Sequence, residues 1–276
     1  MKSKIKRTLK KITVGGMALL LAAIPMLAAT GCEKSKEDVS KLIVGIDDTF
    51  APMGFRDEDG NIVGFDIDLA SAAAEVLGME VEFKPIDWTA KELELKAGTI
   101  NCLWNGLSVT PERLQNMAMS NRYLNNKIVL MSMKESTAVI AKSEDLIGKQ
   151  IGVQGDSSAL EMLKADPSYD SFKDDIKEYK TYDAALMDLK TGRLDAVAID
   201  QVLGEYTNNN MDGIMKVQDY DLGDDFYAIG FAQGDEFLVE RINYALETLI
   251  SNGKAAEISN KWFGKNIVIN QPNITE

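Results

Sequence analysis

The chain has 276 residues, with 30 Lys and Arg against 43 Asp and Glu and no histidine, and its formal net charge is −13. Such an acidic chain is a poor partner for nucleic acid and is repelled by anionic lipid, because both carry negative charge. The lack of histidine excludes serine–histidine triads, histidine general bases and His-containing zinc sites. Most hydrolytic mechanisms are therefore excluded by composition.

The first 31 residues are typical of a signal peptide. Six cations and no acid precede an apolar stretch, 12–29, which Gly15, Gly16 and Pro25 interrupt. The stretch ends in Leu27-Ala28-Ala29-Thr30-Gly31-Cys32, which resembles the lipobox of bacterial lipoproteins and implies that Cys32 is lipidated. The alternative is a retained membrane anchor, which Pro25 and the marginal apolar length disfavour. Removal of this segment leaves 24 Lys and Arg against 43 acids, a formal charge of −19.

Residues 32–40 are charged and lack apolar periodicity, so we expect a tether that carries the lipid. Strands and helices then alternate, with strands expected at 42–46, 81–83 and 100–104. A hairpin is expected at 55–63, turning at Asp59-Gly60, and it is no calcium loop because Ile62 stands where such a loop needs glycine. We expect Asp66 to cap a helix that ends at Gly78, and a capping box at 89–92 to open the next helix. This alternation predicts parallel strands, with ligands bound at their carboxyl ends.

The stretch 105–113, Asn-Gly-Leu-Ser-Val-Thr-Pro-Glu-Arg, joins a strand to a marked helix start. Thr110 is expected to be the N-cap and Pro111 the first helical residue. Arg113 then lies in the first turn, where the helix dipole disfavours a cation. A bound carboxylate would offset that cost, since a guanidinium binds it with two parallel hydrogen bonds. The alternative is a surface arginine in an ordinary salt bridge.

The pattern changes near Leu124, where we expect the chain to cross into a second lobe. Apolar runs at 128–133 and 137–141, strands at 150–154 and 194–199, and helices at 143–147 and 183–190 follow. Another helix is expected to start at Ser157 or Ser158, with Glu161 closing a capping box. A solvated loop is expected at 207–213, a return strand at 227–232, and helices at 236–250 and 255–262. Cys102 lies inside an apolar strand, so no internal disulfide is expected.

Three stretches point to one ligand. Arg113 supplies a cation, the turn Gly155-Asp156-Ser157-Ser158 supplies hydroxyls and a helix N-terminus, and Asp200 supplies the opposite charge. These groups suit a zwitterion whose ammonium and carboxylate share one carbon. The alternative for Asp200 is an N-cap of the helix that follows it.

The sequence resembles the solute-binding proteins of polar amino-acid ABC transporters, solute-binding family 3, over residues 41–266. The resemblance implies an α/β clamp of the type II periplasmic-binding-protein kind, with two parallel or mixed sheets joined by two crossovers. Lobe 1 would comprise 41–125 and 227–276, and lobe 2 would comprise 126–226. The motifs that carry it are Ala51-Pro52-Met53-Gly54-Phe55, Gly64-Phe65-Asp66-Ile67-Asp68-Leu69-Ala70, Leu107-Ser108-Val109-Thr110-Pro111-Glu112-Arg113, Gly152-Val153-Gln154, Gly192-Arg193-Leu194-Asp195-Ala196 and Lys261-Trp262-Phe263-Gly264.

The resemblance also implies roles for single residues. Arg113 and Ser158 would hold the α-carboxylate; Ser108, the Gly106 backbone and Asp200 would hold the ammonium. Asp156 stands where relatives often have glycine, and an acid there should weaken anion binding unless it points away; which of Ser157 and Ser158 is the donor therefore stays open. Phe50 and Trp88 would flank the ligand side chain and Asp47 would meet its far end, unless the two aromatic residues belong only to the core. The predicted ligand-binding set is Asp47, Phe50, Trp88, Asn105, Gly106, Ser108, Arg113, Gln154, Ser157, Ser158 and Asp200.

We therefore expect an extracytoplasmic, membrane-anchored receptor that delivers a polar L-amino acid to an ABC permease, as a monomer without metal or cofactor. Asp47 beneath two aromatic faces favours arginine or lysine. Glutamine and cystine stay open, because Asp47 can also accept from their N–H groups. A cyclohexadienyl-dehydratase-like enzyme on the same fold and a sensory or adhesive lipoprotein are further alternatives; the enzyme would need an acid with a raised pKa.

Overall fold

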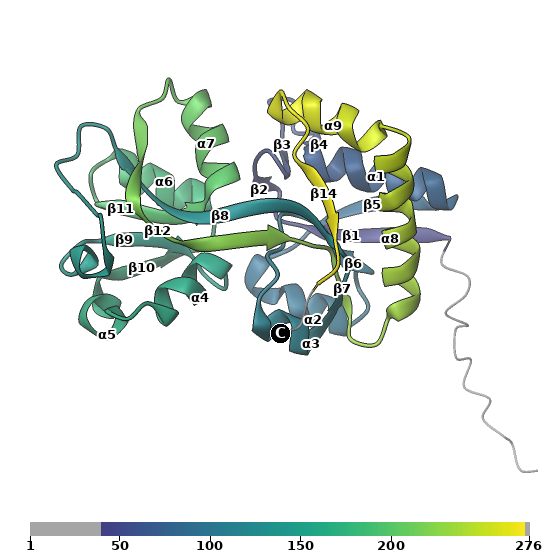
Figure 1. The fold of residues 1–276 in the computed structure, drawn as a ribbon, viewed down its shortest axis with the longest axis horizontal. Helices are drawn as coiled ribbons and strands as arrows, with labels where there is room; N and C mark the ends of the chain where they lie inside the picture. The colour runs from purple at the N-terminus through teal and green to yellow at the C-terminus, as the bar shows by residue number, and fades with distance from the viewer. Residues whose placement is uncertain (1–39, 274–276) are drawn as a thin grey trace, which may run out of the picture. The chain divides into compact units, whose positions relative to one another are not determined.

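The structure is a computed structural model, and it describes residues 40–273. The signal peptide, Cys32 and the tether therefore lie outside the described residues. Within them the fold is α/β with two mixed sheets, each the centre of one lobe (Figure 1). None of the helices within 40–273 has the length and hydrophobicity that a membrane span needs.

The sheet of lobe 1 has the order β5-β1-β6-β13-β7. Its parallel pairs join β1 (Lys41–Ile46) to β5 (Glu80–Pro85) and to β6 (Cys102–Leu103), as the alternation of strands and helices predicts. The strands β7 (Met117–Met119) and β13 (Gly230–Ala232) complete it in antiparallel fashion. A small separate sheet contains β2 (Thr49–Phe50), β3 (Gly54–Arg56) and β4 (Ile62–Val63), so the hairpin at Asp59-Gly60 is confirmed.

Helices cover both faces of this sheet. One face packs against α1 (Phe65–Leu77), α8 (Glu236–Ser251) and α9 (Lys254–Phe263), and the main hydrophobic core lies between them. The other face carries a smaller core with Trp88, next to α2 (Lys91–Lys96) and α3 (Pro111–Asn116). Cys102 and Leu103 belong to different cores, as neighbouring strand residues must. Cys102 is buried and free, as expected.

The sheet of lobe 2 has the order β10-β9-β11-β8-β12. The parallel strands are β9 (Ile151–Gln154), β10 (Ile176–Tyr179) and β11 (Ala196–Asp200). One face packs against α4 (Ser158–Ala165) and α5 (Tyr169–Phe172), the other against α6 (Tyr182–Lys190) and α7 (Gln201–Asn210). Short 3-10 helices lie at Trp88–Ala90, Ser143–Leu146 and Lys173–Asp175.

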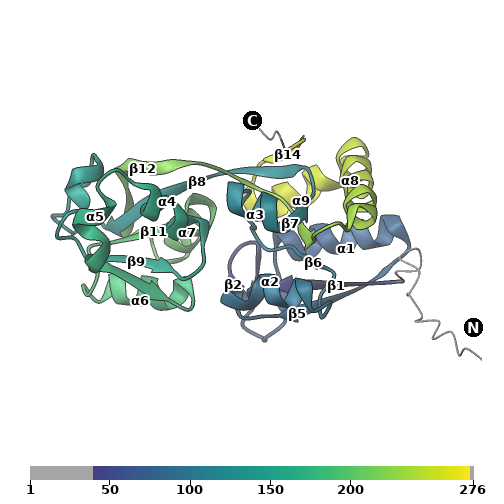
Figure 2. The same cartoon turned by 90° about the horizontal axis from the view of Figure 1, so that it is seen from below.

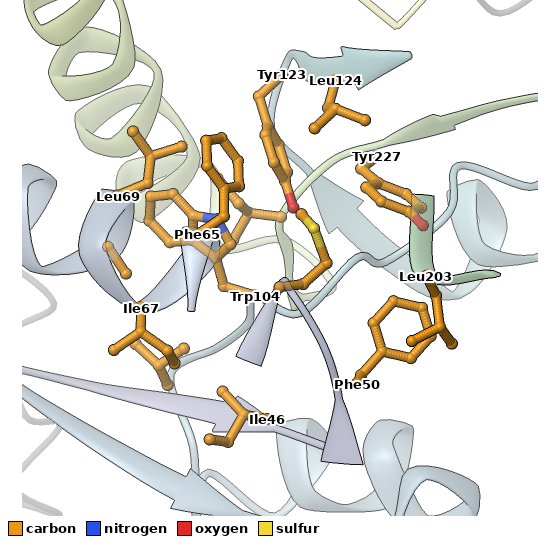
Figure 3. Close-up of a cluster of buried hydrophobic side chains, with 14 of the residues drawn as sticks. Ile46, Phe50, Phe65, Ile67, Leu69, Trp104, Tyr123, Leu124, Leu203 and Tyr227 are labelled. Atoms are coloured by element: carbon orange, nitrogen blue, oxygen red, sulfur yellow. The ribbon is translucent and has the colours of Figure 1, made fainter. Parts of the chain in front are cut away.

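Two long antiparallel strands connect the lobes, β8 (Arg122–Met133) and β12 (Met215–Tyr227) (Figure 2). They pair from Leu124–Tyr227 to Met133–Met215, and β14 (Val268–Gln271) adds a third strand beside β8. The rings of Tyr123 and Tyr227 pack at a tilt of 45°, with centroids 6.4 Å apart, beside a core that includes Phe65 and Trp104 (Figure 3). This aromatic packing ties the strands that cross between the lobes to the core of lobe 1.

Several local predictions are wrong, one because of a tertiary contact and two because another residue caps the helix. Asp66 does not cap α1; its carboxylate is buried and accepts from the Gly106 N–H at 2.8 Å and the Tyr123 hydroxyl at 2.9 Å. The capping box at 89–92 is absent, and Asp87 caps the 3-10 turn at Trp88 instead. Glu161 closes no box either, because Ser157 is the N-cap of α4 and accepts from Leu160.

The region predicted as a solvated loop at 207–213 is partly helical. The α7 helix continues to Asn210 because the Asn208 side chain pairs with both backbone groups of Met215, at 2.8 and 3.1 Å. The predicted return strand at 227–232 is confirmed in part by β13, and a further strand, β12, precedes it from Met215. The apolar run 137–141 forms no strand.

Candidate functional site

Arg113 lies in the first turn of α3, as the sequence predicts. Thr110 is the N-cap and accepts from the Arg113 N–H, and Pro111 begins the helix. The guanidinium is 3% exposed; it donates to the Ser108 carbonyl at 3.0 Å and, across the cleft, to the Asp156 carbonyl at 3.3 Å. A buried cation that bonds mainly to neutral carbonyl groups is free to bind an anionic ligand.

Lys91 lies beside Arg113 and forms the second half of a cation pole, the name used here for this pair. Its ammonium, on a side chain that is 1% exposed, donates to the Asp156 carbonyl at 3.1 Å and pairs with the Asp156 carboxylate. Burial lowers the pKa of Lys91, the charge of Arg113 lowers it further, and Asp156 opposes both effects. The Asp156 carboxylate is therefore paired with a cation of the opposite lobe.

Ser157 and Ser158 open α4 on the lobe 2 side of the cleft. The Ser157 hydroxyl donates to the Gln154 carbonyl at 2.7 Å and accepts from the Leu160 N–H at 3.2 Å, so the helix cap occupies it. The Ser158 hydroxyl instead reaches across the cleft to the Ser108 hydroxyl, 2.8 Å away. Ser158 is thus the serine whose hydroxyl can be exchanged for a ligand contact at little cost.

Asp200 ends β11, at the carboxyl edge of the lobe 2 sheet. Asp200 is the N-cap residue of α7, as the alternative has it, but its side chain makes no capping hydrogen bond and stays available for other contacts. Its Oδ1 accepts from the Tyr227 hydroxyl at 2.7 Å and from the Asn126 amide at 2.8 Å. Burial raises the pKa of Asp200 above its usual range, and the nearby charge of Asp225 raises it further. Asp200 and Asp225 are called the acid pole below.

One residue of each pole, Arg113 and Asp200, lines the same small cavity, whose volume of about 10 Å³ is room for about one water molecule. The structure brings nine of the predicted residues together there, on both lobes, and adds Tyr182. Gly106 lines it in a left-handed conformation (φ 61°), and a side chain there would meet the Phe50 ring at 2.7 Å. The lining residues are Phe50, Trp88, Gly106, Ser108, Arg113, Gln154, Ser157, Ser158, Tyr182 and Asp200.

Asp47 and Asn105, also in the predicted set, lie behind this lining. Asp47 is 7% exposed; its Oδ2 accepts from the Gln154 amide at 2.8 Å, across the cleft, and its Oδ1 accepts from the Thr49 hydroxyl at 2.7 Å. The Asn105 amide donates to the Asp47 carbonyl at 3.2 Å and packs against Gly54. Gln154 therefore stands between Asp47 and the cavity.

Three residues at or near the two poles and the cavity were not predicted from the sequence. Tyr182 places its ring 6.0 Å from that of Phe50, and its buried hydroxyl has no partner among the described residues. Lys91 lies within 89–92, the segment that was wrongly predicted to be a capping box. Asp225 lies on β12, where the hydrophobic pattern of the sequence predicts no strand. The only signal for Asp225 was its place in the acidic run Asp224-Asp225, which is usually a solvated surface.

A wider groove, of about 940 Å³, lies along the strands that join the lobes and between α7, α9 and β14. None of the predicted site residues lines it. It lacks the convergence of buried charges that marks the smaller cavity, and we take the smaller cavity as the candidate site on that chemical ground.

Comparison with known proteins gives a consistent result. Residues 42–265 match the bacterial extracellular solute-binding proteins, family 3. The arginine-binding extracellular protein ArtP of Bacillus subtilis is 30% identical over 255 residues, covering 90% of this chain and 97% of its own; the L-cystine-binding protein TcyJ of Escherichia coli is 24% identical over 261 residues, covering 94% and 97%. A solved ABC-transporter substrate-binding protein from Streptococcus pneumoniae with bound histidine is 38% identical, with a TM-score of 0.79, covering 84% of this chain and 95% of that one.

Proposed function

The chain belongs to family 3 of the bacterial extracellular solute-binding proteins, and on that premise we propose that it is the amino-acid receptor of an ABC importer. The family consists of solute-binding transport proteins, so the enzymatic alternative falls away. One observation carries the proposal further: Arg113 and Asp200, of opposite charge and each 3% exposed, line the same small cavity from different lobes. A small zwitterion is the ligand that satisfies both charges at once.

The ligand's carboxylate lies at the cation pole in this proposal. Arg113 binds it, and the Ser158 hydroxyl, which the helix cap does not occupy, adds a donor. The ammonium lies against Asp200, the Ser108 hydroxyl and the Gly106 carbonyl. Because these groups belong to both lobes, the bound amino acid bridges them and favours the closed clamp.

The side chain of the ligand extends toward Gln154 and Asp47, between the rings of Phe50 and Trp88. An acid behind aromatic faces favours a cationic side chain through ion pairing and cation–π contact. We therefore propose a basic amino acid, with arginine and lysine first. Histidine is the second candidate, because the histidine-bound solved structure is 38% identical to this chain. An affinity near micromolar, about −8 kcal/mol, suits a receptor that must release its cargo.

We also propose that Cys32 carries a lipid that holds the receptor at the outer face of the membrane, and that the closed clamp is a monomer recognised by the permease. Metabolic labelling with a palmitate analogue tests the anchor: wild type incorporates the label, whereas Cys32→Ala does not.

A thermal-shift panel tests the ligand class, because a ligand in excess raises the melting temperature by mass action. The panel contains L-arginine, L-lysine, L-histidine, L-glutamine, L-cystine and L-glutamate. We expect the largest shift with arginine or lysine, and calorimetry then gives the affinity. The largest shift with glutamate would contradict the role of Asp47, and no shift with any amino acid would contradict the receptor assignment.

A further inference from the structure

The acid pole holds two carboxylates where one ammonium needs only one. Asp200 and Asp225 come from β11 and β12 and are both almost fully buried. The amide of Asn126, on β8, donates one N–H to Asp200 Oδ1 and the other to Asp225 Oδ2, each at 2.8 Å. The Asn126 oxygen accepts from the Val202 N–H at 3.4 Å, which is consistent with this orientation of the amide. One neutral side chain thus holds two acids together.

Asp225 also determines which way the Ser108 hydroxyl points. The Ser108 oxygen lies 2.9 Å from Asp225 Oδ2 and 2.8 Å from the Ser158 hydroxyl. A hydroxyl has one hydrogen, and Asp225 Oδ2, which also accepts from Asn126, can only accept, whether or not Oδ1 carries a proton. The Ser108 hydrogen therefore goes to Asp225, and the oxygen's remaining lone pairs face Ser158 and the cavity.

The charged and titratable groups around the pair come from several elements. Arg113, from α3, is the cation that favours ionisation of both acids. The tyrosines Tyr227 from β12 and Tyr182 from α6 stay neutral, because burial and the charges of the acids raise their pKa well above the usual value. Asp225 Oδ1 is buried without a hydrogen-bond partner among the described residues. A buried oxygen without a donor is costly when charged, which favours a proton on the pair of acids.

We propose that Asp225 is a positioning residue: it turns the Ser108 hydroxyl into an acceptor for the ligand's ammonium and, in the empty site, shares with Asp200 a proton that binding expels. This inference rests on the proposed function, since it requires a ligand with an ammonium group. The proton moves from the carboxyl pair to the solvent buffer, and the incoming ammonium replaces its positive charge. No other bond forms or breaks.

The direction of the two pKa values agrees with this account. Burial raises the pKa of both Asp200 and Asp225, while hydrogen bonds from Tyr227 to Asp200 and from Asn126 and Ser108 to Asp225 only partly oppose it. An ammonium at the pole favours the ionised form and lowers both pKa values again. Affinity should therefore fall as pH is lowered from about 8 to about 5, where the site must lose a proton to bind.

Calorimetry of L-arginine binding in buffers of different ionisation enthalpy measures the proton count directly. Near pH 6.5 we expect wild type to release roughly half a proton per ligand. In Asp225→Asn we expect release to fall below about a tenth of a proton, with affinity at pH 8 about tenfold weaker. Asp224→Asn is the matched control, because Asp224 is the exposed neighbour, pairs with Lys127 at 3.4 Å and lies outside the cavity.

The α-hydroxy analogue of L-arginine, in which a hydroxyl replaces the ammonium, tests the hydroxyl polarity. Wild type should strongly prefer L-arginine, and the preference should shrink about tenfold in Asp225→Ala, where the Ser108 hydrogen loses its acceptor at position 225 and is free to turn toward the cavity. A purely structural role of Asp225 would weaken both ligands equally and leave the proton count unchanged, which would overturn the inference.

Failure of the two proposals is distinguishable. If no amino acid binds wild type, the proposed function fails. If wild type binds L-arginine without proton release at any pH, this inference fails while the function stands, and that result needs no variant to fold.

Discussion

The cation pole and the acid pole balance their charges in different ways. Lys91 and Arg113 on lobe 1 face Asp156 on lobe 2, and Arg113 Nη2 also lies 3.6 Å from the Glu161 carboxylate. The acid pole sets like charges together and holds them with the neutral donors of Asn126, Tyr227 and Ser108. The first arrangement is complete only when the lobes meet; the second belongs to β11 and to the strands that join the lobes.

This difference separates two tasks. An ion pair across a cleft favours the closed form, because opening separates two charges that attract each other. A pair of buried acids does not resist opening in that way, but it gives the empty site a surplus of negative charge and a proton to exchange. Changes at the cation pole should therefore alter affinity most, and changes to buried acids should alter pH dependence most.

Loss of the Arg113 guanidinium should have the largest effect. In Arg113→Ala we expect L-arginine affinity to fall by at least about 100-fold, because a desolvated carboxylate loses a two-bond partner, at a cost of several kcal/mol. Calorimetry measures this loss of affinity. Arg193→Ala is the control, since Arg193 is exposed and pairs with Asp188 at 2.7 Å. Unchanged affinity in Arg113→Ala would mean that the carboxylate binds elsewhere.

Loss of the cross-cleft ion pair should have an intermediate effect. In Lys91→Met we expect affinity about tenfold weaker, because Asp156 then stays uncompensated beside the ligand's carboxylate. Adding Asp156→Asn to that variant should restore part of the loss, and the double-mutant cycle gives the coupling energy. The exposed pair Lys180–Asp87, 3.0 Å apart, also crosses the cleft and serves as a comparison of small effect. Additive single changes would show that Lys91 and Asp156 act independently.

Replacement of Asp66 should change the stability of the protein rather than the charge that meets the ligand. Its effect on affinity should therefore be the smallest. Its pKa is raised to about 7, first by burial, so native protein binds more protons than unfolded protein between about pH 4 and pH 7. The free energy of unfolding must then fall as pH rises through that window, by up to a few kcal/mol. Urea unfolding at several pH values should show a shallower fall in Asp66→Asn. An equal slope in both proteins would mean that Asp66 is not the buried acid that titrates.

Much of the fold follows from local pattern. The sequence predicts four of these features correctly, because each depends on hydrophobic periodicity or on a capping residue. They are the strand β1, the end of α1 at Gly78, the start of α3 at Thr110-Pro111 and the amphipathic helix α8. The long strand β12 was not predicted from the sequence, because its residues 219–225 are largely acidic. Pairing with β8, rather than strand propensity, stabilises them as a strand.

The same division applies to the site. Arg113, Ser108, Ser158 and Asp200 were predicted, since each stands at a strand end or helix start that the sequence marks. Lys91, Tyr182 and Asp225 were not, because their residue types are ordinary on a surface and only packing buries them.

Sequence alone determined that this acidic, histidine-free chain alternates strands and helices and carries an arginine and an aspartate at two strand-to-helix junctions. Those features are local, so short-range patterns encode them. Only the tertiary structure decided that Asp156 meets Lys91, that Asp225 stands beside Asp200, and that Asp47 lies behind Gln154. The charge balance of a buried site depends on which groups the fold brings together far along the chain, and no local pattern contains that information.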